Sequence, residues 1–378
     1  MKPRIVVVIL IAMVLGSAVL AQNRKQHLNP MIDLLDQHKV IVGGVPATYP
    51  RPQAGGGGRG PGAEPGEANT APDACGLVPP APRGGGGAVG RGQGPGGGNR
   101  GGFAPPAPAA QTMEEAARMT LALKSSDFLN GSMEGGVDNA IGPFSDFMKA
   151  LSQAGALVKA PTAHLSQPYY VKTPKISRDP EKAILNISKQ LNTGLSGVIF
   201  VAADCAREVQ LGLAAMRPKS AGGRRPSDYG DAPAYWGLTP AQYEQKADVW
   251  GFNPNGELVN WTIIESLDGI KNVRDIAKEK GIGVLIPGAG TLGGVFTTTN
   301  ADGQRVRDNE GWENGIQKIL AACKEFKVNC GFPASTPAEI EMRFRQGFNV
   351  FVLQSWSPTS FDTMAKGREL GGRAATND

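Results

Sequence analysis

Short apolar runs alternate with amphipathic segments along most of the chain. Runs such as LSGVIFVAA (195–203), LVNWTIIE (258–265) and NVFVLQS (349–355) have the length and the β-branched content of buried strands. RDPEKAILNISKQLNTG (178–194) and NEGWENGIQKILAACKEFK (309–327) carry apolar residues three to four positions apart, which predicts helices. The pattern therefore predicts a repeated unit of one strand followed by one helix.

The sequence contains eight such units. The remaining strands are expected in HKVIVGGVPA (38–47), DFLNGSMEGG (127–136), PYYVK (168–172), IGVLIPGAG (282–290) and VNCGFPA (328–334). Alternating strands and helices imply a parallel sheet, and eight units in roughly 300 residues favour a (β/α)8 TIM-type barrel over an open doubly wound sheet. No G-x-G-x-x-G opens a helix after the first strand, which argues against a dinucleotide-binding fold.

Two stretches interrupt this pattern. Residues 51–110 hold 20 of the 52 glycines and 11 of the 29 prolines. Such a composition buries too little apolar surface to offset the entropy of ordering, so we expect a disordered insertion after the first strand. It is either a flexible insertion or a segment that binds an acidic cell-wall polymer. The second interruption is a polar stretch, 217–257, which follows a helix whose expected N-cap is Asp204.

The first residues have the pattern of a secretory signal peptide. Lys2 and Arg4 precede an apolar run, 5–15, and Val19–Ala21 offers a cleavage site. An uncleaved membrane anchor is the alternative, but the apolar run is short for a span of about 20 residues. We therefore expect an exported bacterial protein, periplasmic or extracellular, without a stable membrane span after cleavage. The expected organisation is 1–21 signal peptide, 22–50 N-terminal segment and first strand, 51–110 insertion, and 111–378 remainder of the barrel.

Charge and cysteine content exclude two classes of site. The formal net charge is +5, and the basic run of 217–225 lacks interleaved aromatic residues, so no nucleic-acid surface is expected. The four cysteines lack the spacing of a zinc site. A disulfide is chemically allowed in an exported protein. Cys323 and Cys330 are close in sequence, but a helix followed by a strand is expected to point them apart.

One carboxylate falls where a barrel carries its chemistry. Active sites of such barrels lie at the C-terminal ends of the strands, and the strand expected in 258–265 ends at Glu265. A buried carboxylate needs a partner, so Glu265 is a candidate ligand for Mg²⁺ or Mn²⁺. The alternative is an N-cap or first-turn acid of the next helix.

Four segments resemble the HpcH/HpaI aldolase/citrate lyase family, a group of class II pyruvate-type aldolases. They are DFLNGSMEGG, YEQKADVW, IIESLDGIKNV and IPGAGTLGG, in the family's order, and the resemblance covers about 28–50 and 111–375. It implies a (β/α)8 barrel that cleaves a carbon–carbon bond in a hydroxy-oxo acid. It also implies a divalent cation that stabilises the enolate, and a hexamer.

The resemblance assigns roles to individual residues. Glu265 matches the first metal ligand, and Thr291 occupies the position of the second, an aspartate in the family. Gly288, Ala289, Gly290 and Thr291 match the substrate-binding turn. Lys172 falls nearest to an arginine that assists the enolate charge.

Other family positions have changed. Glu134 is retained and is the candidate base, because Gly135 replaces the family's histidine. Ser132 replaces an aspartate and Ile263 a substrate-contacting glutamine. An alternative is a cation shared by Glu134 and Glu265, with Asp231 or Asp248 from the polar stretch completing the site.

Three functions are therefore open. The first is an exported, metal-dependent carbon–carbon lyase whose partner is a small keto acid or carboxylate. The second is an inactive or drifted barrel that binds a small carboxylate or a cell-envelope polymer, since the histidine, aspartate and glutamine are missing. The third is cleavage of an ester or thioester in the same type of barrel.

Overall fold

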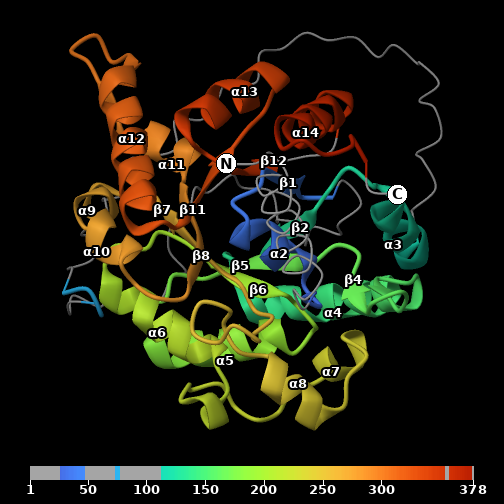
Figure 1. Ribbon diagram of the computed structural model, residues 1–378. Coiled ribbons are helices and arrows are strands. Elements are labelled where there is room, and N and C mark those ends of the chain that lie inside the picture. Colours follow the sequence, from blue (N-terminus) through green and yellow to red (C-terminus); the bar gives the residue numbers. More distant parts are fainter. Residues whose placement is uncertain (1–25, 47–72, 77–111, 354–356, 377–378) are drawn as a thin grey trace, which may run out of the picture.

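Eight parallel strands close into a barrel with helices around it in the computed structural model of the chain (Figure 1). The structure describes residues 26–46, 73–76, 112–353 and 357–376. The barrel strands are β1 (Ile41–Gly44), β2 (Phe128–Ser132), β5 (Tyr169–Thr173), β6 (Gly197–Phe200), β7 (Asn260–Ile264), β8 (Ile282–Pro287), β11 (Asn329–Pro333) and β12 (Val350–Leu353). Their order is β1-β12-β11-β8-β7-β6-β5-β2, and β1 pairs with β2 to close the barrel. The predicted fold class and all eight strands are confirmed.

The helices follow the strands in the expected alternation. They are α2 (Pro30–Asp36), α3 (Met113–Ala122), α4 (Val137–Gln153), α5 (Pro180–Leu191), α6 (Ala206–Met216), α9 (Leu267–Lys271), α10 (Val273–Ala277), α11 (Ala289–Val295), α12 (Asn309–Phe326), α13 (Pro337–Gln346) and α14 (Pro358–Leu370). The polar stretch folds into η1 (Lys219–Ala221), α7 (Ala232–Tyr235) and α8 (Pro240–Lys246). Two small hairpins, β3 (Leu157–Val158) with β4 (His164–Leu165) and β9 (Thr297–Thr299) with β10 (Arg305–Arg307), were not expected.

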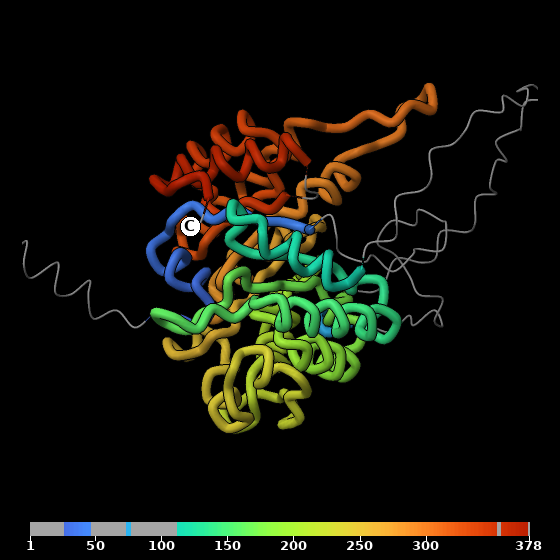
Figure 2. The backbone as a smooth tube through the Cα atoms, turned by 90° about the vertical axis from the view of Figure 1, so that its right-hand side faces the viewer, coloured from blue at the N-terminus to red at the C-terminus, as the bar shows by residue number. Residues whose placement is uncertain are grey.

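Large side chains fill the barrel interior. Phe128, Tyr170 and Trp261 pack edge-on or tilted, with the Phe128 and Tyr170 ring centroids 4.9 and 5.1 Å from that of Trp261. Helix α2 adds Met31, Ile32 and Leu35 to the same apolar cluster, so it closes one end of the barrel. The functional cavity described below therefore opens at the other end. In Figure 2 the hairpin β9–β10 stands out from the body of the molecule, as it does in Figure 1.

Two disulfides pair all four cysteines. Cys323 and Cys330 are bonded, with Cα atoms 5.8 Å apart, so the expectation that they point apart was wrong. Lys327 adopts a left-handed conformation (φ 56°) after α12 and turns the chain sharply into β11, which brings the two side chains together. Cys75 is bonded to Cys205 at the start of α6. Residues 73–76 thus have a defined position inside a stretch expected to be disordered throughout.

Cys205 also corrects a helix boundary. Its sulfur accepts a hydrogen bond from Glu208 N, 3.4 Å away, so Cys205 and not Asp204 is the N-cap of α6.

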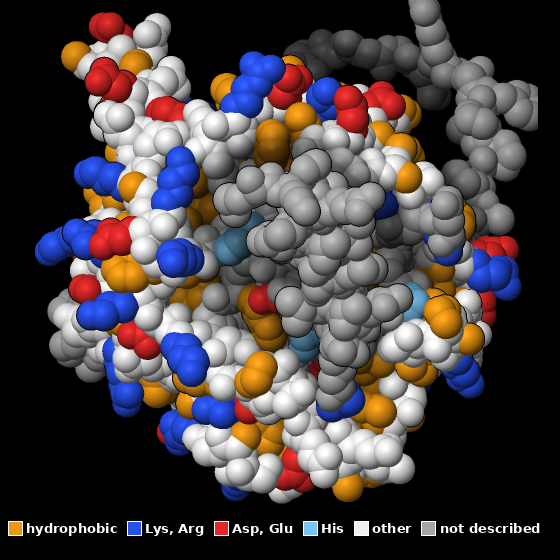
Figure 3. Space-filling view, in the orientation of Figure 1, with side chains coloured by type: hydrophobic (Ala, Val, Ile, Leu, Met, Phe, Trp, Pro, Cys, Tyr) orange, Lys and Arg blue, Asp and Glu red, His pale blue; other side chains and the backbone are white. Residues whose placement is uncertain are grey.

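The expected signal peptide lies outside the described residues, as does most of the 51–110 insertion. In the described part of the chain, each helix is too short or too polar to cross a membrane. On the face shown in Figure 3, Lys and Arg side chains are interspersed with Asp and Glu.

Candidate active site

A cavity of about 810 Å³ opens at the C-terminal end of the barrel strands. Its apolar lining includes five strand residues that belong to the cluster inside the barrel, Ile199, Trp261, Ile263, Ile286 and Val352. Its polar lining includes Asn130, Ser132, Lys172, Glu265, Thr291, Arg307, Ser335 and Glu339. The cavity therefore combines an apolar wall with a few charged groups, which is the usual composition of a small-molecule site.

Glu265 lies in this cavity, at the end of β7, with only 9% of its surface exposed. One carboxylate oxygen, Oε2, accepts a hydrogen bond of 3.1 Å from Ala202 N, and Oε1 accepts one of 2.9 Å from Thr291 Oγ1. Gly288 leaves the space for this carboxylate, because a Cβ there would lie 2.3 Å from Glu265 Cγ. Two donors, Ala202 in the loop after β6 and Thr291 in α11, thus hold the side chain in one orientation.

The capping alternative for Glu265 is wrong. Ser266 is the N-cap of α9, and its hydroxyl accepts a hydrogen bond of 2.9 Å from Gly269 N. Glu265 precedes the cap and its side chain belongs to the cavity. The structure therefore places the strand-end carboxylate where the sequence predicted it, and its role as a metal ligand stays a prediction.

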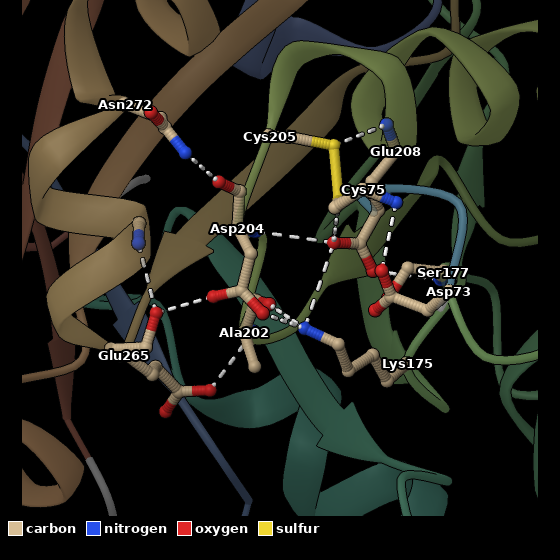
Figure 4. Close-up of polar contacts among 12 residues, drawn as sticks. Asp73, Cys75, Lys175, Ser177, Ala202, Asp204, Cys205, Glu208, Glu265 and Asn272 are labelled. Carbon is tan, nitrogen blue, oxygen red and sulfur yellow. Dashed lines mark hydrogen bonds and ion pairs between the residues drawn. A yellow bond between two sulfur atoms is a disulfide. The ribbon is translucent and has the colours of Figure 1, made fainter. Parts of the chain in front are cut away.

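A buried ionic cluster supports Ala202, as Figure 4 shows. Ala202 has a left-handed backbone (φ 49°), which is unfavourable for a residue with a Cβ. Lys175 Nζ donates a hydrogen bond of 2.6 Å to Ala202 O and also pairs with Asp204, which in turn accepts a hydrogen bond from Ser266. The cluster is thus connected to Glu265 twice. Ala202 donates a hydrogen bond to the Glu265 carboxylate, and Ser266, which binds Asp204, is the next residue in the chain.

Glu208 completes this cluster from the first turn of α6. It is 1% exposed, and Lys175 Nζ lies 3.7 Å from its carboxylate. Burial raises the pKa of Glu208, although Lys175 and the N–H groups of Ser177 and Asp204 act in the opposite direction. The sequence predicted none of these contacts, because all but the one between Asp204 and Glu208 join residues between 27 and 62 positions apart.

Lys172 and Glu134 form an ion pair of 3.3 Å beside the cavity. Both side chains are partly exposed, at 29% and 26%, and Ser132 Oγ lies 3.4 Å from the same Glu134 oxygen. A Cβ at Gly135, the position of the family's histidine, would meet no atom within 4 Å. The two residues predicted to act on a proton and a developing charge therefore lie together, and of the two only Lys172 lines the cavity.

The four residues predicted to bind substrate lie in the turn after β8 and at the start of α11. Gly288, Ala289, Gly290 and Thr291 all line the cavity. Their contact with a substrate stays a prediction.

Asp231 and Asp248 do not complete the site. Asp248 is paired with Arg217 at 2.7 Å and Asp231 with Lys149 at 3.4 Å, and neither lines the cavity. Their carboxylates are neutralised elsewhere, so these two suggestions were wrong.

The side chains available as metal ligands determine how a divalent cation can bind in the cavity. Within the described residues, no three His, Cys, Asp or Glu side chains gather as metal ligands. Glu265 and Thr291 supply one carboxylate and one hydroxyl, with oxygens 2.9 Å apart. Mg²⁺ often binds through one or two carboxylates together with the substrate and water. The site therefore fits a hard cation completed by a bound ligand and water, and not one held by the protein alone.

Comparisons with known proteins support the fold. No family model and no curated protein sequence matches the chain. A solved HpcH/HpaI aldolase/citrate lyase family protein from Burkholderia cenocepacia J2315 is similar, with a TM-score of 0.50, 20% identity, and coverage of 68% of this chain and 90% of that one. An HpcH/HpaI aldolase from Desulfitobacterium hafniense DCB-2 has a TM-score of 0.46, 14% identity and coverage of 70% and 91%. The chain has the barrel fold of this family, as the sequence resemblance implied.

Proposed function

We propose that this protein is a lyase that breaks a carbon–carbon bond in a small hydroxy-oxo acid bound in the cavity beside Glu265. The observation that carries the proposal is the Glu265 carboxylate, fixed at the end of β7 by Ala202 N and Thr291 Oγ1. Its place at the C-terminal end of a barrel strand is that of catalytic groups in such folds. The similarity to the Burkholderia protein supports the fold and not, by itself, the activity.

Glu265 and Thr291 would hold a divalent cation, Mg²⁺ or Mn²⁺, together with the oxo acid and water. Bound there, such a cation would supply Lewis-acid polarisation of the oxo group. The Gly288–Gly290 backbone lines the same side of the cavity without side chains larger than a methyl group. It therefore leaves room for the carboxylate end of a substrate next to Glu265.

Lys172 and Glu134 would handle the proton and the charge. In the cleavage direction, Glu134 accepts the proton of the substrate hydroxyl, and the electron pair of that O–H bond forms the aldehyde carbonyl. The carbon–carbon bond breaks, and its electron pair moves into the oxo acid to give an enolate. Lys172, 3.3 Å from Glu134, then faces both the developing negative charge and the protonated base. A proton returned to the enolate carbon releases the shortened oxo acid.

We also propose that the protein works outside the reducing cytoplasm of a bacterium, in the periplasm or beyond it. The pairing of all four cysteines in disulfides supports this, because disulfides persist in oxidising compartments.

A homo-oligomer, such as the family's hexamer, is a second proposal. In the single chain, α14 packs on its own β1, where Gly367 meets Val42. A size measurement decides between the monomer and the oligomer.

A binding protein without turnover is the competing function. The described residues that line the cavity include no histidine, and Gly135 stands where the family has its base. In that case Glu134 remains bound to Lys172 and the cavity binds an oxo acid or a related carboxylate unchanged.

Exchange of the methyl protons of pyruvate for deuterium tests the proposal without knowledge of the aldehyde. We expect the purified protein with Mn²⁺ or Mg²⁺ to catalyse this exchange, followed by proton NMR in D₂O. Glu265→Gln and Glu134→Gln should abolish it, whereas Glu114→Gln, an exposed acid on α3, should not. Exchange no faster in the wild type than in Glu265→Gln, with pyruvate still bound, would favour the binding protein.

A further inference from the structure

A short segment from outside the barrel joins two loops beside the candidate site. Residues 73–76 contact both the loop after β5 and the loop after β6 (Figure 4). Ala74 N donates a hydrogen bond of 3.1 Å to Ser177 O in the first loop. Cys75 is bonded to Cys205 at the end of the second. The segment therefore acts as a clamp across these two loops.

The two clamped loops carry the contacts that fix Glu265. Lys175, in the first loop, donates a hydrogen bond of 2.6 Å to Ala202 O in the second. Ala202 N lies 3.1 Å from Glu265 Oε2. The left-handed conformation of Ala202 (φ 49°) persists only where the surrounding contacts maintain it. Because Cys205 belongs to the same loop as Ala202, the clamp acts on the peptide that positions the candidate metal ligand.

The same segment covers the buried acid of the ionic cluster. Cys75 Sγ lies 3.7 Å from Glu208 Oε2, and the Glu208 side chain is only 1% exposed. Lys175 Nζ lies 3.7 Å from the same oxygen. If residues 73–76 moved away, water would reach this carboxylate and weaken its attraction to Lys175. Release of the segment should therefore loosen the lysine that holds Ala202.

The two disulfides differ in their access to a reductant. Cys75 and Cys205 are both partly exposed, whereas Cys323 and Cys330 are 1% and 2% exposed. Thiol–disulfide exchange requires that a thiolate reaches one of the two sulfur atoms. A dithiol in solution should therefore reduce the bond beside the ionic cluster before the bond that joins α12 to β11.

We propose that the Cys75–Cys205 disulfide is a redox switch for the cavity. When bonded it holds Glu265 in place, and a dithiol that reduces it loosens the site without unfolding the barrel. The inference rests on the proposed function, because the site that it regulates is the one that binds the oxo acid.

The switch uses ordinary thiol–disulfide exchange. A thiolate of the dithiol attacks one of the two sulfurs, the Cys75–Cys205 bond breaks, and a mixed disulfide forms. The second thiol of the reductant then displaces the cysteine from that mixed disulfide. The dithiol is thereby oxidised to a disulfide, and its two electrons and two protons leave both cysteines as thiols.

Calorimetry with oxalate and Mn²⁺ tests the switch on the purified protein before and after mild reduction. The protein is treated with dithiothreitol, the freed thiols are blocked with iodoacetamide, and mass spectrometry identifies the blocked residues. We expect blocking at Cys75 and Cys205 only, and an affinity for oxalate about tenfold lower. Reoxidation of an unblocked sample should restore the affinity.

Two double variants serve as controls. Cys75→Ser with Cys205→Ser lacks the bridge, and serine keeps an N-cap for α6. This variant should bind oxalate like the reduced wild type and should not respond to dithiothreitol. Cys323→Ala with Cys330→Ala removes the other disulfide and should keep the full response to reduction.

Hydrogen exchange separates the switch from the proposed function. On reduction, the amide of Ala202 should exchange faster, while the amides of β12, on the opposite side of the barrel, should stay protected. Faster exchange at Ala202 without oxalate binding in either state would overturn the proposed function and leave the switch in the loop. Unchanged exchange and affinity after selective reduction would overturn the switch. Loss of protection in β12 would refute it too, since the disulfide would then hold the whole fold.

Discussion

Lys175 donates a hydrogen bond of 2.6 Å to the carbonyl oxygen of Ala202, and the N–H of Ala202 lies 3.1 Å from Glu265 Oε2. Lys175 thus fixes the carbonyl group of Ala202, and the N–H of Ala202 fixes the carboxylate of Glu265, the candidate metal ligand. Because Ala202 adopts an unfavourable left-handed conformation, the turn depends on such contacts. Lys175 is a positioning residue for Glu265, although it does not line the cavity itself.

Replacing Lys175 by methionine should therefore damage both stability and binding. The change leaves Asp204 and Glu208 buried without their cation, and we expect the free energy of unfolding to fall by about 3 kcal/mol or more. Urea denaturation measures this loss. Affinity for oxalate with Mn²⁺ should fall as well, measured by calorimetry on the fraction that remains folded.

Lys189→Met is the matched control for that variant. Lys189 pairs with Asp138 at the surface, where both side chains are more than half exposed. An exposed pair contributes at most about 1 kcal/mol, so this variant should stay close to the wild type. Equal losses in the two variants would contradict the supporting role of Lys175.

Thr291→Asp should create a stronger metal site. The hydroxyl of Thr291 lies 2.9 Å from Glu265, so an aspartate there brings a second carboxylate to the same point. We expect Mn²⁺ affinity to rise about tenfold or more, because hard cations bind more tightly as ligand charge increases. We also expect repulsion between the two acids to lower thermal stability without metal and Mn²⁺ to restore it.

Calorimetry and thermal unfolding with and without Mn²⁺ measure these two effects. Thr291→Asn is the control, because it has nearly the same size and no charge. Should the aspartate variant bind Mn²⁺ no better than the asparagine variant, Glu265 and residue 291 do not share a cation.

The two disulfides should contribute unequally to stability. Cys75 and Cys205 are 130 residues apart in sequence, whereas Cys323 and Cys330 are 7 apart. In the chain-entropy relation, closing these loops stabilises the fold by about 5 and about 2.5 kcal/mol. Urea denaturation of the double alanine variants, one for each disulfide, should therefore show the larger loss for Cys75 with Cys205. Equal losses would mean that the unfolded chain is not constrained as this relation assumes.

Stability should depend on pH through His27 and Glu257. The hydrogen bond with Glu257 raises the pKa of His27 above 6.5. Burial raises the pKa of Glu257, but the bonds from His27 and Asn29 outweigh it, and the net pKa is below 4.5. The His27 contribution is therefore complete below pH 6.5 and is lost as pH rises through its folded pKa. The Glu257 contribution is present above pH 4.5 and is lost as pH falls through its folded pKa.

Urea denaturation across pH 4 to 9 tests this pair. We expect the contribution of His27 and Glu257 to the free energy of unfolding to be largest between pH 4.5 and pH 6.5. His27→Gln should flatten the decline above pH 6.5, and Glu257→Gln should lower the free energy of unfolding near pH 6 by about 1 to 3 kcal/mol. Parallel profiles for the wild type and His27→Gln would exclude His27 as the titrating group.

The sequence predicts the barrel because each strand is a short apolar run buried on both faces. It also predicts the place of Glu265, since the end of a strand is a local property of the chain. The cluster around Lys175 is different, because Asp204 and Glu208 meet it only when β5 and β6 lie side by side. The pairing of Cys75 with Cys205 is equally non-local.

A pattern in the sequence does predict the hairpin that contains Arg307. Thr297–Thr299 and Arg305–Arg307 are short β-rich runs around an Asn-Ala-Asp-Gly turn, in which Gly303 adopts a positive φ of 76°. The hairpin has few apolar residues, since most of its surface faces solvent. A search for buried strands therefore passes over it, and with it over the arginine.

The bond between Cys75 and Cys205 also makes a covalent ring of the chain, which encloses β2, β5 and β6. One backbone cut at any point between the two cysteines leaves a single covalent molecule, because the sulfur bridge still joins the two pieces. A protease acting on that part of the chain would thus produce a nicked form with unchanged mass, apart from one added water. Such nicking becomes visible as two fragments only after reduction.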